Sequence, residues 1–398
     1  MGKNLNGREI GKGIRQRANG TYEARFKVGD KQCSIYGNNL KEVKAKLELE
    51  KAKASSVLAV RYQHYTLNQW YDEWFETFKK KSLKLTSIEP MRRKYKNSFG
   101  RIIGEKKLLD ITNMDIQRVV NQLADEGKSS TTIRDCLGRT RDCFAGAVNN
   151  GIIPINPCIE IVLPRMGGKK EERRFLSTDE QKAFLNVASE GWYKEMFYIM
   201  FLTGMRVGEI GGLMWEDVDF ENGKININRS LSCLYYDGEK SLVLTEPKTV
   251  NSYRSIPFMG EAREMLLSQK EKQERLREEL GNRWRSDFDG LVFTSTMGSE
   301  CTRYIVEREV SKIVDEINAL EEVNAKAENR NPVYFEKMYP HAIRHTFCSR
   351  CYERGIDVKS TQKLMGHSSI NVTLDYYTHL SEEQYDDVIA KFGSMDEE

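Results

Sequence analysis

The sequence predicts a multidomain α+β protein: a small three-stranded sheet plus one helix, then an all-helical domain, then a mainly helical domain with a small antiparallel sheet. Short alternating runs separated by turn residues fill positions 13–38. Helical periodicity follows from residue 66 to about residue 150, and helix and strand patterns are mixed after residue 175. We therefore expect domains at 1–60, 65–165 and 174–398, within the range that 398 residues allow.

The first predicted domain is a sheet with one apolar and one charged face. In the run TYEARFKV, apolar positions 22, 24, 26 and 28 alternate with charged positions 23, 25 and 27. Turn signals lie at 18–20 and 28–30. A helix is expected from Leu40 to about Leu58.

Charge is distributed unevenly along the chain, although its net value is only +3. Residues 1–61 carry 14 basic and 6 acidic side chains, a net charge of +8, and residues 62–165 carry 17 and 12. The remainder carries 31 basic and 41 acidic side chains. The basic front favours contact with a polyanion such as DNA, and a solvated basic surface or a docking domain is the alternative. The candidate contacts on the first sheet are Arg15, Arg17, Arg25 and Lys27.

The middle of the chain predicts a bundle of helices. The run TLNQWYDEWFETFKK carries an apolar stripe at helical spacing, and further helices are expected at 87–102, 112–126 and 129–150. Thr112 and Ser129 or Ser130 are the expected N-caps. A proline-rich segment and the polar linker MGGKKEERR follow. Candidate contacts to a DNA backbone here are Lys79, Lys80, Lys81, Lys84, Arg92, Arg93, Lys94 and Lys96.

The last domain begins with a helix that Ser177 or Thr178 caps. Helices are expected near 192–202, after residue 204, and at 260–280, 301–318, 341–354, 358–365 and 370–378, with 321–335 unassigned. A hairpin is predicted around 221–223, and two more strands around a loop at 248–251.

Composition excludes several classes of protein. No apolar run approaches the roughly 18 residues of a membrane span, and the N-terminus lacks the apolar core of a signal peptide, so a cytoplasmic protein is expected. Cys348 and Cys351 form a CxxC, but no second ligand pair is spaced to complete a zinc site. We interpret them as reduced helix residues and expect neither metal nor cofactor.

Five short segments of the last domain contain residues suited to chemistry at a phosphodiester. They are TGMRVGEI (203–210), EPKTVNSYRSIPF (246–258), HAIRHTF (341–347), MGHSS (365–369) and LDYYTHL (374–380). Each has an ordinary explanation alone: an arginine at a helix end, a satisfied core histidine, a packed tyrosine pair, or Lys248 and Arg254 flanking an exposed hairpin. Their joint occurrence in this order favours a shared site.

The residue types supply what transesterification at phosphorus requires. Arg206 and Arg344 can present planar forks to phosphate oxygens. His341 and His367 can form hydrogen bonds or move protons, and His341 shares a helix face with Arg344 at i,i+3 spacing. Lys248 could protonate a leaving oxygen, and Glu209 could orient Arg206 or a neighbouring histidine. A tyrosine hydroxyl is a weak nucleophile that such neighbours would activate.

The five segments resemble the tyrosine recombinase (phage integrase) family, whose signature is Arg, Lys, His-x-x-Arg, His and Tyr, and in particular the integrases of conjugative transposons. The resemblance implies that Arg206 and Arg344 bind the scissile phosphate and that Lys248 is the general acid. His341 and His367 take the two histidine positions, and Glu209 takes the acidic position after the first arginine. The family pattern ends YTH, which favours Tyr377 over its neighbour Tyr376 as the nucleophile.

The same resemblance implies an arm-DNA-binding domain at 1–60, a helical core-binding domain at 65–165 and a catalytic domain at 174–398. The expected activity is integration and excision of a mobile element through a 3′-phosphotyrosine, by a homo-tetramer on double-stranded core and arm DNA sites, with a possible excisionase or DNA-bending protein. The helical and catalytic domains would hold the core site from opposite sides. The apolar positions 385, 388, 389 and 392 predict a tail helix that packs on its own domain or on a neighbouring subunit.

Three other functions are compatible with parts of this pattern. A type IB topoisomerase uses the same residue set, but an arm-like first domain and a tail argue against it. A catalytically silent DNA-binding regulator would be expected to lose Tyr377 or an arginine, and all are present. A metal nuclease would need clustered carboxylates, which do not accompany the five segments.

Overall fold

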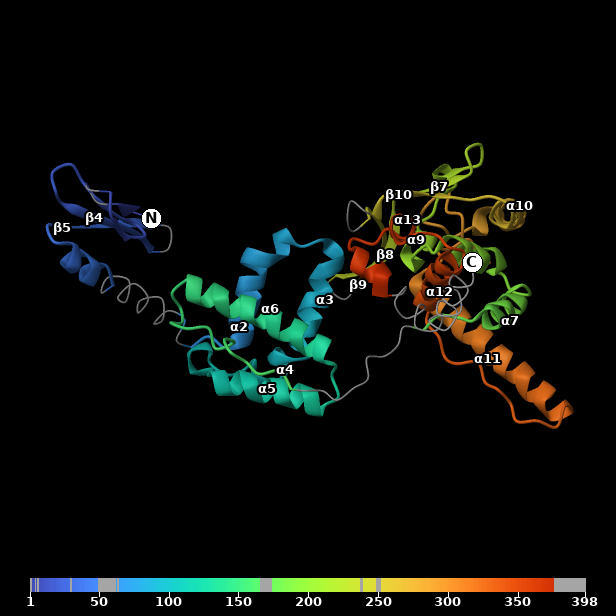
Figure 1. The fold of residues 1–398 in the computed structure, drawn as a ribbon, viewed down its shortest axis with the longest axis horizontal. Coiled ribbons are helices and arrows are strands. Elements are labelled where there is room, and N and C mark those ends of the chain that lie inside the picture. Colours follow the sequence, from blue (N-terminus) through green and yellow to red (C-terminus); the bar gives the residue numbers. More distant parts are fainter. Residues whose placement is uncertain are drawn as a thin grey trace, which may run out of the picture. The chain divides into compact units, whose positions relative to one another are not determined.

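The computed structural model describes residues 2–3, 5, 7–28, 31–48, 62, 64–164, 174–236, 239–247 and 252–375 (Figure 1). Its internal contacts divide the chain into two units, Met1–Lys169 and Lys170–Glu398. The architecture is α+β, as predicted, with strands near the N-terminus and in the C-terminal unit and a helical region at 62–164. The three predicted domain boundaries are finer than this division and remain a prediction.

An antiparallel sheet of order β3-β4-β5 lies near the N-terminus and confirms the predicted three strands. The strands are β3 (Ile14–Gln16), β4 (Tyr22–Val28) and β5 (Lys31–Gly37). Alternation directs Ala24 toward the helical segment 40–48, whose Val43 and Leu47 are buried against it. Two short strands that were not predicted, β1 (Gly2–Lys3) and β2 (Glu9–Gly11), form a separate ladder.

The helical region is built from short helices with local capping. Thr112 and Ser129 are the N-caps of α5 and α6, as predicted, because each hydroxyl accepts a hydrogen bond from the backbone N–H three residues later. The bounds are α2 (Leu67–Trp74), η1 (Phe75–Lys79), η2 (Lys80–Ser82), α3 (Leu85–Lys96), α4 (Phe99–Ile103), η3 (Leu108–Asp110), α5 (Asn113–Asp125) and α6 (Ser130–Asn149).

The prediction of one continuous helix at 87–102 is wrong. Asn97 and Ser98 leave helical geometry between α3 and α4, at φ/ψ of −84°/0° and −127°/−106°. The Ser98 hydroxyl donates to the carbonyl of Lys94 at 2.7 Å and so satisfies one of the acceptors that the helix end leaves open. Helical periodicity continues through this break, which is why the pattern alone did not locate it.

Aromatic packing joins α2, α3 and α6. The rings of Tyr71 and Tyr95 stack in parallel with centroids 3.5 Å apart, and Trp70 Nε1 donates to the carbonyl of Cys143 at 3.1 Å. Gly146 lets α6 approach α2 closely, because a Cβ there would lie 2.5 Å from Trp74. The basic side chains of α3 therefore project from a rigid, well-packed scaffold.

The C-terminal unit surrounds α8, which is apolar on nearly all sides and contacts α7, α10 and α12. Its N-terminal helix α7 has the predicted cap, Ser177. The helices are α7 (Thr178–Ala188), α8 (Lys194–Thr203), α9 (Val207–Gly211), η4 (Trp215–Asp217), α10 (Glu261–Leu280), η6 (Gly281–Arg283), α11 (Arg303–Ala327), α12 (Pro340–Glu353) and α13 (Val358–Met365). The strands are β6 (Val218–Asp219), β7 (Lys224–Ile227), β8 (Ser230–Tyr236), β9 (Glu239–Thr245) and β10 (Arg254–Pro257).

Strand pairing in this unit differs from the expected order. The hairpin β6-β7 forms around the predicted turn, where Gly223 has a φ of +61°. The strands on either side of loop 248–251 exist but do not pair with each other: β10 pairs with β7, and β9 pairs with β8. Strand β8, the partner of β9, was not predicted from the sequence.

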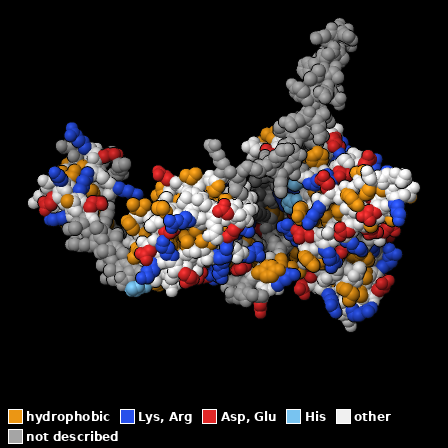
Figure 2. Space-filling model, turned by 90° about the horizontal axis from the view of Figure 1, so that it is seen from below, with side chains coloured by type: hydrophobic (Ala, Val, Ile, Leu, Met, Phe, Trp, Pro, Cys, Tyr) orange, Lys and Arg blue, Asp and Glu red, His pale blue; other side chains and the backbone are white. Residues whose placement is uncertain are grey.

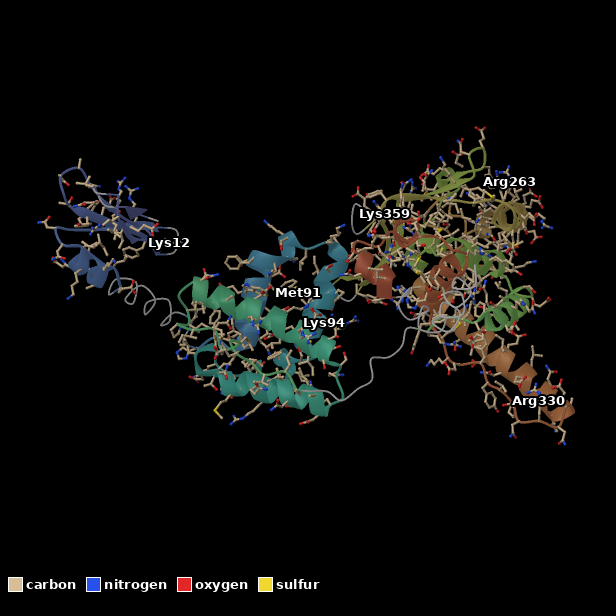
Figure 3. All side chains as sticks on the ribbon, viewed as in Figure 1. Lys12, Met91, Lys94, Arg263, Arg330 and Lys359 are labelled. Carbon is tan, nitrogen blue, oxygen red and sulfur yellow. The ribbon has the colours of Figure 1, made fainter. Side chains whose placement is uncertain are left out.

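Helix α11 is longer than predicted and projects from the unit (Figure 1). It continues to Ala327, through the first part of the segment 321–335 that was left unassigned. Arg330, at the far end of this projection (Figure 3), forms ion pairs with Glu321 and Glu328 that fix the turn after the helix. Residues 370–375 are helical, and the predicted tail helix lies outside the described residues.

The surface of the C-terminal unit mixes charges of both signs on the face drawn in Figure 2. An anion would therefore be attracted by a local cationic pocket rather than by the whole unit. Cys348 and Cys351 are buried in α12, as expected for helix residues, and burial raises the pKa of Cys351 to about 11. Among the residues described, we find no helix with the length and apolar character of a membrane span.

Candidate active site

Arg206 stands at a sharp junction between two helices. Helix α8 ends at Gly204, whose φ is +62° and whose missing Cβ would lie 2.4 Å from Phe347. Arg206 follows as the N-cap of α9 with its side chain one-third exposed. Its Nη1 donates to Glu209 Oε1 at 2.7 Å and its Nη2 to the carbonyl of Gly366 at 3.0 Å. The guanidinium is thus held on two sides and still open to solvent.

Glu209 is a buried carboxylate shared between two arginines. Besides Arg206, Arg254 donates to both of its oxygens, at 3.1 and 2.8 Å. Burial acts to raise the pKa of Glu209, but the hydrogen bonds and charge of Arg254, with the charge of Arg206, lower it to about 2. Glu209 is therefore an anion that orients cations, as the sequence predicts for its position.

Arg344 lies on α12 and is 4% exposed. Its Nη1 donates to the carbonyl of Gly204 at 2.6 Å, and its Nη2 donates to the carbonyl of Met365. These carbonyls lie at the C-terminal ends of α8 and α13, where helix dipoles favour a cation. Arg344 thus holds the C-terminal ends of the two helices that Arg206 and His367 follow in sequence.

The two predicted histidines differ in exposure. His367 follows α13 directly, because Gly366 turns the chain with a φ of +63°. It is buried, and its Nδ1 lies 2.9 Å from the hydroxyl of Thr373. Desolvation and the charges of Arg344 and Arg206 lower its pKa to about 3. His341 is exposed on α12, although neighbouring atoms desolvate its ring enough, with Arg344, to lower its pKa as well. Both imidazoles are therefore neutral near pH 7.

A cavity of about 340 Å³ collects several of these groups. We call it the α9–α13 cavity. It is lined by Arg206, Glu209, Ser230, Pro247, Ser252, Gly366, His367, Ser368 and Val372. Of the predicted catalytic set, Arg206 and His367 line it, together with the supporting residue Glu209. Arg344 and His341 do not line it, and Arg344 reaches its wall through the carbonyl next to Gly366.

Lys248, Tyr376 and Tyr377 lie outside the described residues. Described residues close to them in sequence nevertheless line the α9–α13 cavity. Pro247 and Ser252 flank the segment that carries Lys248, and Val372 belongs to the helical segment that precedes Tyr376. The roles of these three residues stay predictions.

Arg254 is a residue that the sequence analysis misjudged. It was considered as a flank of an exposed hairpin, but its side chain is 3% exposed. Its Nε donates to the carbonyl of Leu364 at 2.6 Å, which ties β10 to α13. The alternation in β10 contained the signal, because Arg254 shares a strand face with the buried Ile256.

The predicted DNA-contacting side chains separate into paired and exposed groups. Arg15, Arg17 and Arg25 all meet at Glu23, and the side chain of Lys27 lies outside what the structure describes. In the helical region, four of the eight cations form ion pairs with Glu76, Asp135 or Asp142: Lys79, Lys80, Arg92 and Lys94 (the last labelled in Figure 3). Lys81, Lys84, Arg93 and Lys96 are exposed.

A cavity lined by one open guanidinium and a neutral imidazole, with two more guanidiniums behind it, suits binding and turnover of a phosphodiester. Comparison with known proteins agrees with this class. The description "Phage integrase family" matches residues 173–384, and "Phage integrase, N-terminal SAM-like domain" matches residues 66–124. The chain belongs to the phage integrase family: it is a tyrosine recombinase, an enzyme of site-specific DNA recombination.

The chain is also similar to individual recombinases and integrases. The tyrosine recombinase XerC-like protein of Caldanaerobacter subterraneus is 30% identical over 373 residues, which cover 91% of each chain. The solved Tn1549 transposon integrase in complex with transposon right end DNA has a TM-score of 0.63 and 22% identity, covering 81% of this chain and 99% of that one. A lambda integrase tetramer bound to a Holliday junction has a TM-score of 0.52 and 20% identity, covering 93% and 95%. These two structures show a shared fold, and the first is a transposon integrase.

We predict that Arg254→Lys slows DNA cleavage without weakening DNA binding. A lysine cannot donate to both oxygens of Glu209, so Arg206 would lose its orientation, and a displacement of about 1 Å at a reacting group can cost about 100-fold in rate. Single-turnover cleavage at saturating enzyme should fall by about 10- to 100-fold, with the Kd for the same DNA changed by less than about twofold. Arg263→Lys, on the surface of the same unit, is the control. Unchanged cleavage in Arg254→Lys would contradict this role.

We predict that His367 makes the C-terminal unit less stable in acid. An unfolded histidine binds a proton near pH 6.5, but folded His367 binds one only near pH 3, so the unfolded chain holds more protons between these values. The contribution of neutral His367 to the free energy of unfolding is therefore fully present above pH 6.5. It decreases as the pH falls from 6.5 toward 3. Between about pH 7 and pH 5, wild type should lose roughly 2 kcal/mol more than His367→Gln. Amide hydrogen exchange in α12 measures the stability of both proteins at each pH. Equal losses of stability in wild type and His367→Gln would disprove the prediction.

Proposed function

We propose that the chain integrates and excises a mobile DNA element by cleaving and rejoining DNA through a 3′-phosphotyrosine on Tyr377. The observation that carries this proposal is the α9–α13 cavity, where Arg206, oriented by Glu209, and neutral His367 share one wall. Arg344 and Arg254 add positive charge directly behind that wall. Such a site stabilises charge on phosphate oxygens as a transition state forms.

The reaction divides into two balanced transesterifications. In the first, the Tyr377 oxygen forms a bond to phosphorus and passes its proton to a neutral histidine, His367 or His341. The bond to the 5′ oxygen breaks, and that oxygen gains a proton, which we assign to Lys248. In the second, a 5′ hydroxyl of the partner DNA attacks the phosphotyrosine and gives its proton to Lys248, while the released tyrosine oxygen takes back the proton held by the histidine. Because the ester retains the energy of the broken bond, rejoining requires no external energy source.

Each side chain has a role that its environment supports. Arg206 is open enough to contact a nonbridging oxygen directly. Arg344 is more deeply held, by its bonds to the carbonyls of Gly204 and Met365, and it adds fixed positive charge to the site. A neutral His367 or His341 can accept a proton, and its ring N–H can donate a hydrogen bond to the phosphate. This supports the predicted catalytic set of Arg206, Lys248, His341, Arg344, His367 and Tyr377.

We assign the three predicted domains to separate tasks on double-stranded DNA: 1–60 to arm sites, 65–165 to core sites and 174–398 to catalysis. Separate buried clusters at 10–47, 62–158 and 176–343 support the assignment. The solved Tn1549 integrase carries DNA and the lambda integrase tetramer carries a Holliday junction, which supports a homo-tetramer here, aided by an excisionase or DNA-bending protein. Acting on cellular DNA, the protein would work in the cytoplasm.

We predict that only one of the adjacent tyrosines forms the covalent link. Neighbouring helix residues point about 100° apart, so one hydroxyl at most can face the phosphate. Incubation with a nicked, site-bearing duplex should give a protein–DNA adduct on denaturing gels with wild type and Tyr376→Phe, and none with Tyr377→Phe. An adduct that persists in Tyr377→Phe and disappears in Tyr376→Phe would reverse the assignment.

We predict that the exposed cations of α3 contribute more to DNA binding than the paired ones. Arg93 and Lys96 are exposed, whereas the charge of Lys94 is balanced by Asp135. Each phosphate contact contributes roughly −0.9 to the slope of log K against log salt. The double variant Arg93→Ala/Lys96→Ala should therefore reduce the slope by about 1.8, which is about 0.9 per residue, and Lys94→Ala should reduce it by less than about 0.5. Equal effects per residue in a filter-binding salt series would contradict this ranking.

A further inference from the structure

The charged face of the N-terminal sheet contains one buried anion among its cations. Glu23 on β4 is 1% exposed. Arg15, Arg17 and Arg25 each donate to its carboxylate, at 2.7, 3.0 and 2.7 Å. Their hydrogen bonds lower the pKa of Glu23 to about 2, so it remains ionised, and the cluster carries a net charge of +2.

Strand register explains why these side chains share one face. Arg15 on β3 and Tyr36 on β5 are the cross-strand partners of Glu23. Arg25 lies two residues further along β4, and Arg17 two residues beyond Arg15, so both project on the same side. Ala24 and its partner Ile35 point to the opposite side, where the helical segment 40–48 packs.

The atoms that bind Glu23 leave the outer ends of the arginines available. All three arginines use Nε. Among the described residues, the side chains of Arg15 and Arg25 make no other hydrogen bond, while Arg17 Nη2 donates to Tyr36 Oη at 3.4 Å and its guanidinium lies 4.8 Å from the centre of that ring. The paired terminal nitrogens of Arg15 and Arg25 are the atoms that an arginine presents to guanine O6 and N7 in a major groove.

A carboxylate at the centre of such a face has opposite effects on two kinds of DNA binding. It repels phosphates, so it weakens sequence-independent attraction. It also limits the rotamers of three long side chains, which lowers the entropy lost when they form directional bonds. An anion whose only effect was electrostatic would therefore be unfavourable on a DNA-binding face.

We propose that Glu23 is a positioning residue that holds the guanidiniums of Arg15 and Arg25 ready for contacts with base edges, so that sequence-specific binding by the N-terminal sheet depends on it. This rests on the proposed function, in which residues 1–60 bind arm DNA. The inference predicts an unusual result: removing a negative charge from a DNA-binding face weakens binding to the correct sequence.

The probe is a duplex selected by the protein itself. The full chain, carrying Tyr377→Phe to prevent cleavage, is used to select from a pool of random-sequence duplexes. A parallel selection uses the same chain with Arg15→Ala/Arg25→Ala. A motif enriched only in the first selection belongs to the N-terminal sheet, and a duplex bearing it is then compared with a scrambled duplex by fluorescence anisotropy over a range of salt concentrations.

Glu23→Gln should bind the selected duplex at least about fivefold more weakly, since one good bidentate base contact contributes roughly 5- to 150-fold in discrimination. It should bind the scrambled duplex as tightly as wild type or more tightly. Glu42→Gln, in the helical segment 40–48, changes the net charge equally and serves as the matched control. That control should leave the ratio of the two affinities within about twofold of wild type.

Each other outcome overturns a specific statement. A specificity ratio in Glu23→Gln equal to wild type overturns the role of Glu23 and leaves arm binding intact. Identical motifs in the two selections overturn arm binding by this face and the inference with it. If hydrogen exchange shows that Glu23→Gln unfolds 22–37, Arg25→Lys decides, because it keeps the charge: reduced affinity for the selected duplex alone supports the inference, and unchanged affinity overturns it.

Discussion

The arrangement of the active site depends on the buried carboxylate of Glu209, which is stable only while Arg206 and Arg254 remain bound to it. Glu209 is 5% exposed, and a buried charge is tolerated only when paired and hydrogen-bonded. Removing one partner of such a pair costs about 3–5 kcal/mol. Arg206 and Arg254 bind it, and through them the ends of α9, β10 and α13 are joined. The requirement to neutralise Glu209 therefore also fixes the position of the guanidinium that faces the cavity.

This network explains the electrostatics of the whole cavity. The guanidiniums of Arg206 and Arg254 at Glu209, with that of Arg344 nearby, leave an excess of positive charge in a partly buried volume, where it acts on an anion more strongly than in water. Burial, together with this excess of charge, lowers the pKa of His367 and His341, so that both remain neutral. A bound phosphate would balance this excess of positive charge. The attraction therefore acts on the reacting group, where it can favour the transition state, and not on the rest of the DNA.

The sequence was sufficient for the fold class, the family and most helices, because caps such as Ser177 and the apolar periodicity are local signals. It was insufficient where a signal depended on distant partners. The pairing of β9 with β8, and of β10 with β7, was missed because strand partners are chosen by packing. The break at Ser98 required a side-chain bond that competes with the helix.

The site residues that local motifs mark were predicted from the sequence, and those whose position depends on a distant partner were not. Arg206, Glu209 and His367 were found from short motifs and do share the α9–α13 cavity. The burial of Arg254 could not be inferred from charge, since an arginine after a loop is usually exposed and only its carboxylate partner makes burial favourable. The arrangement around Glu23 uses the same principle, in which an acidic residue organises arginines. In both places the anion determines where the cations point.

The most direct test of the central claim is a structure of the full chain with nicked site DNA and vanadate. Vanadate adopts the geometry of the phosphoryl transition state. The account predicts a vanadium atom bonded to the Tyr377 oxygen, with Arg206 and Arg344 donating to its equatorial oxygens and Glu209 still bound to Arg254. A vanadate bound elsewhere, or one held at Tyr377 without contact to either arginine, would contradict it.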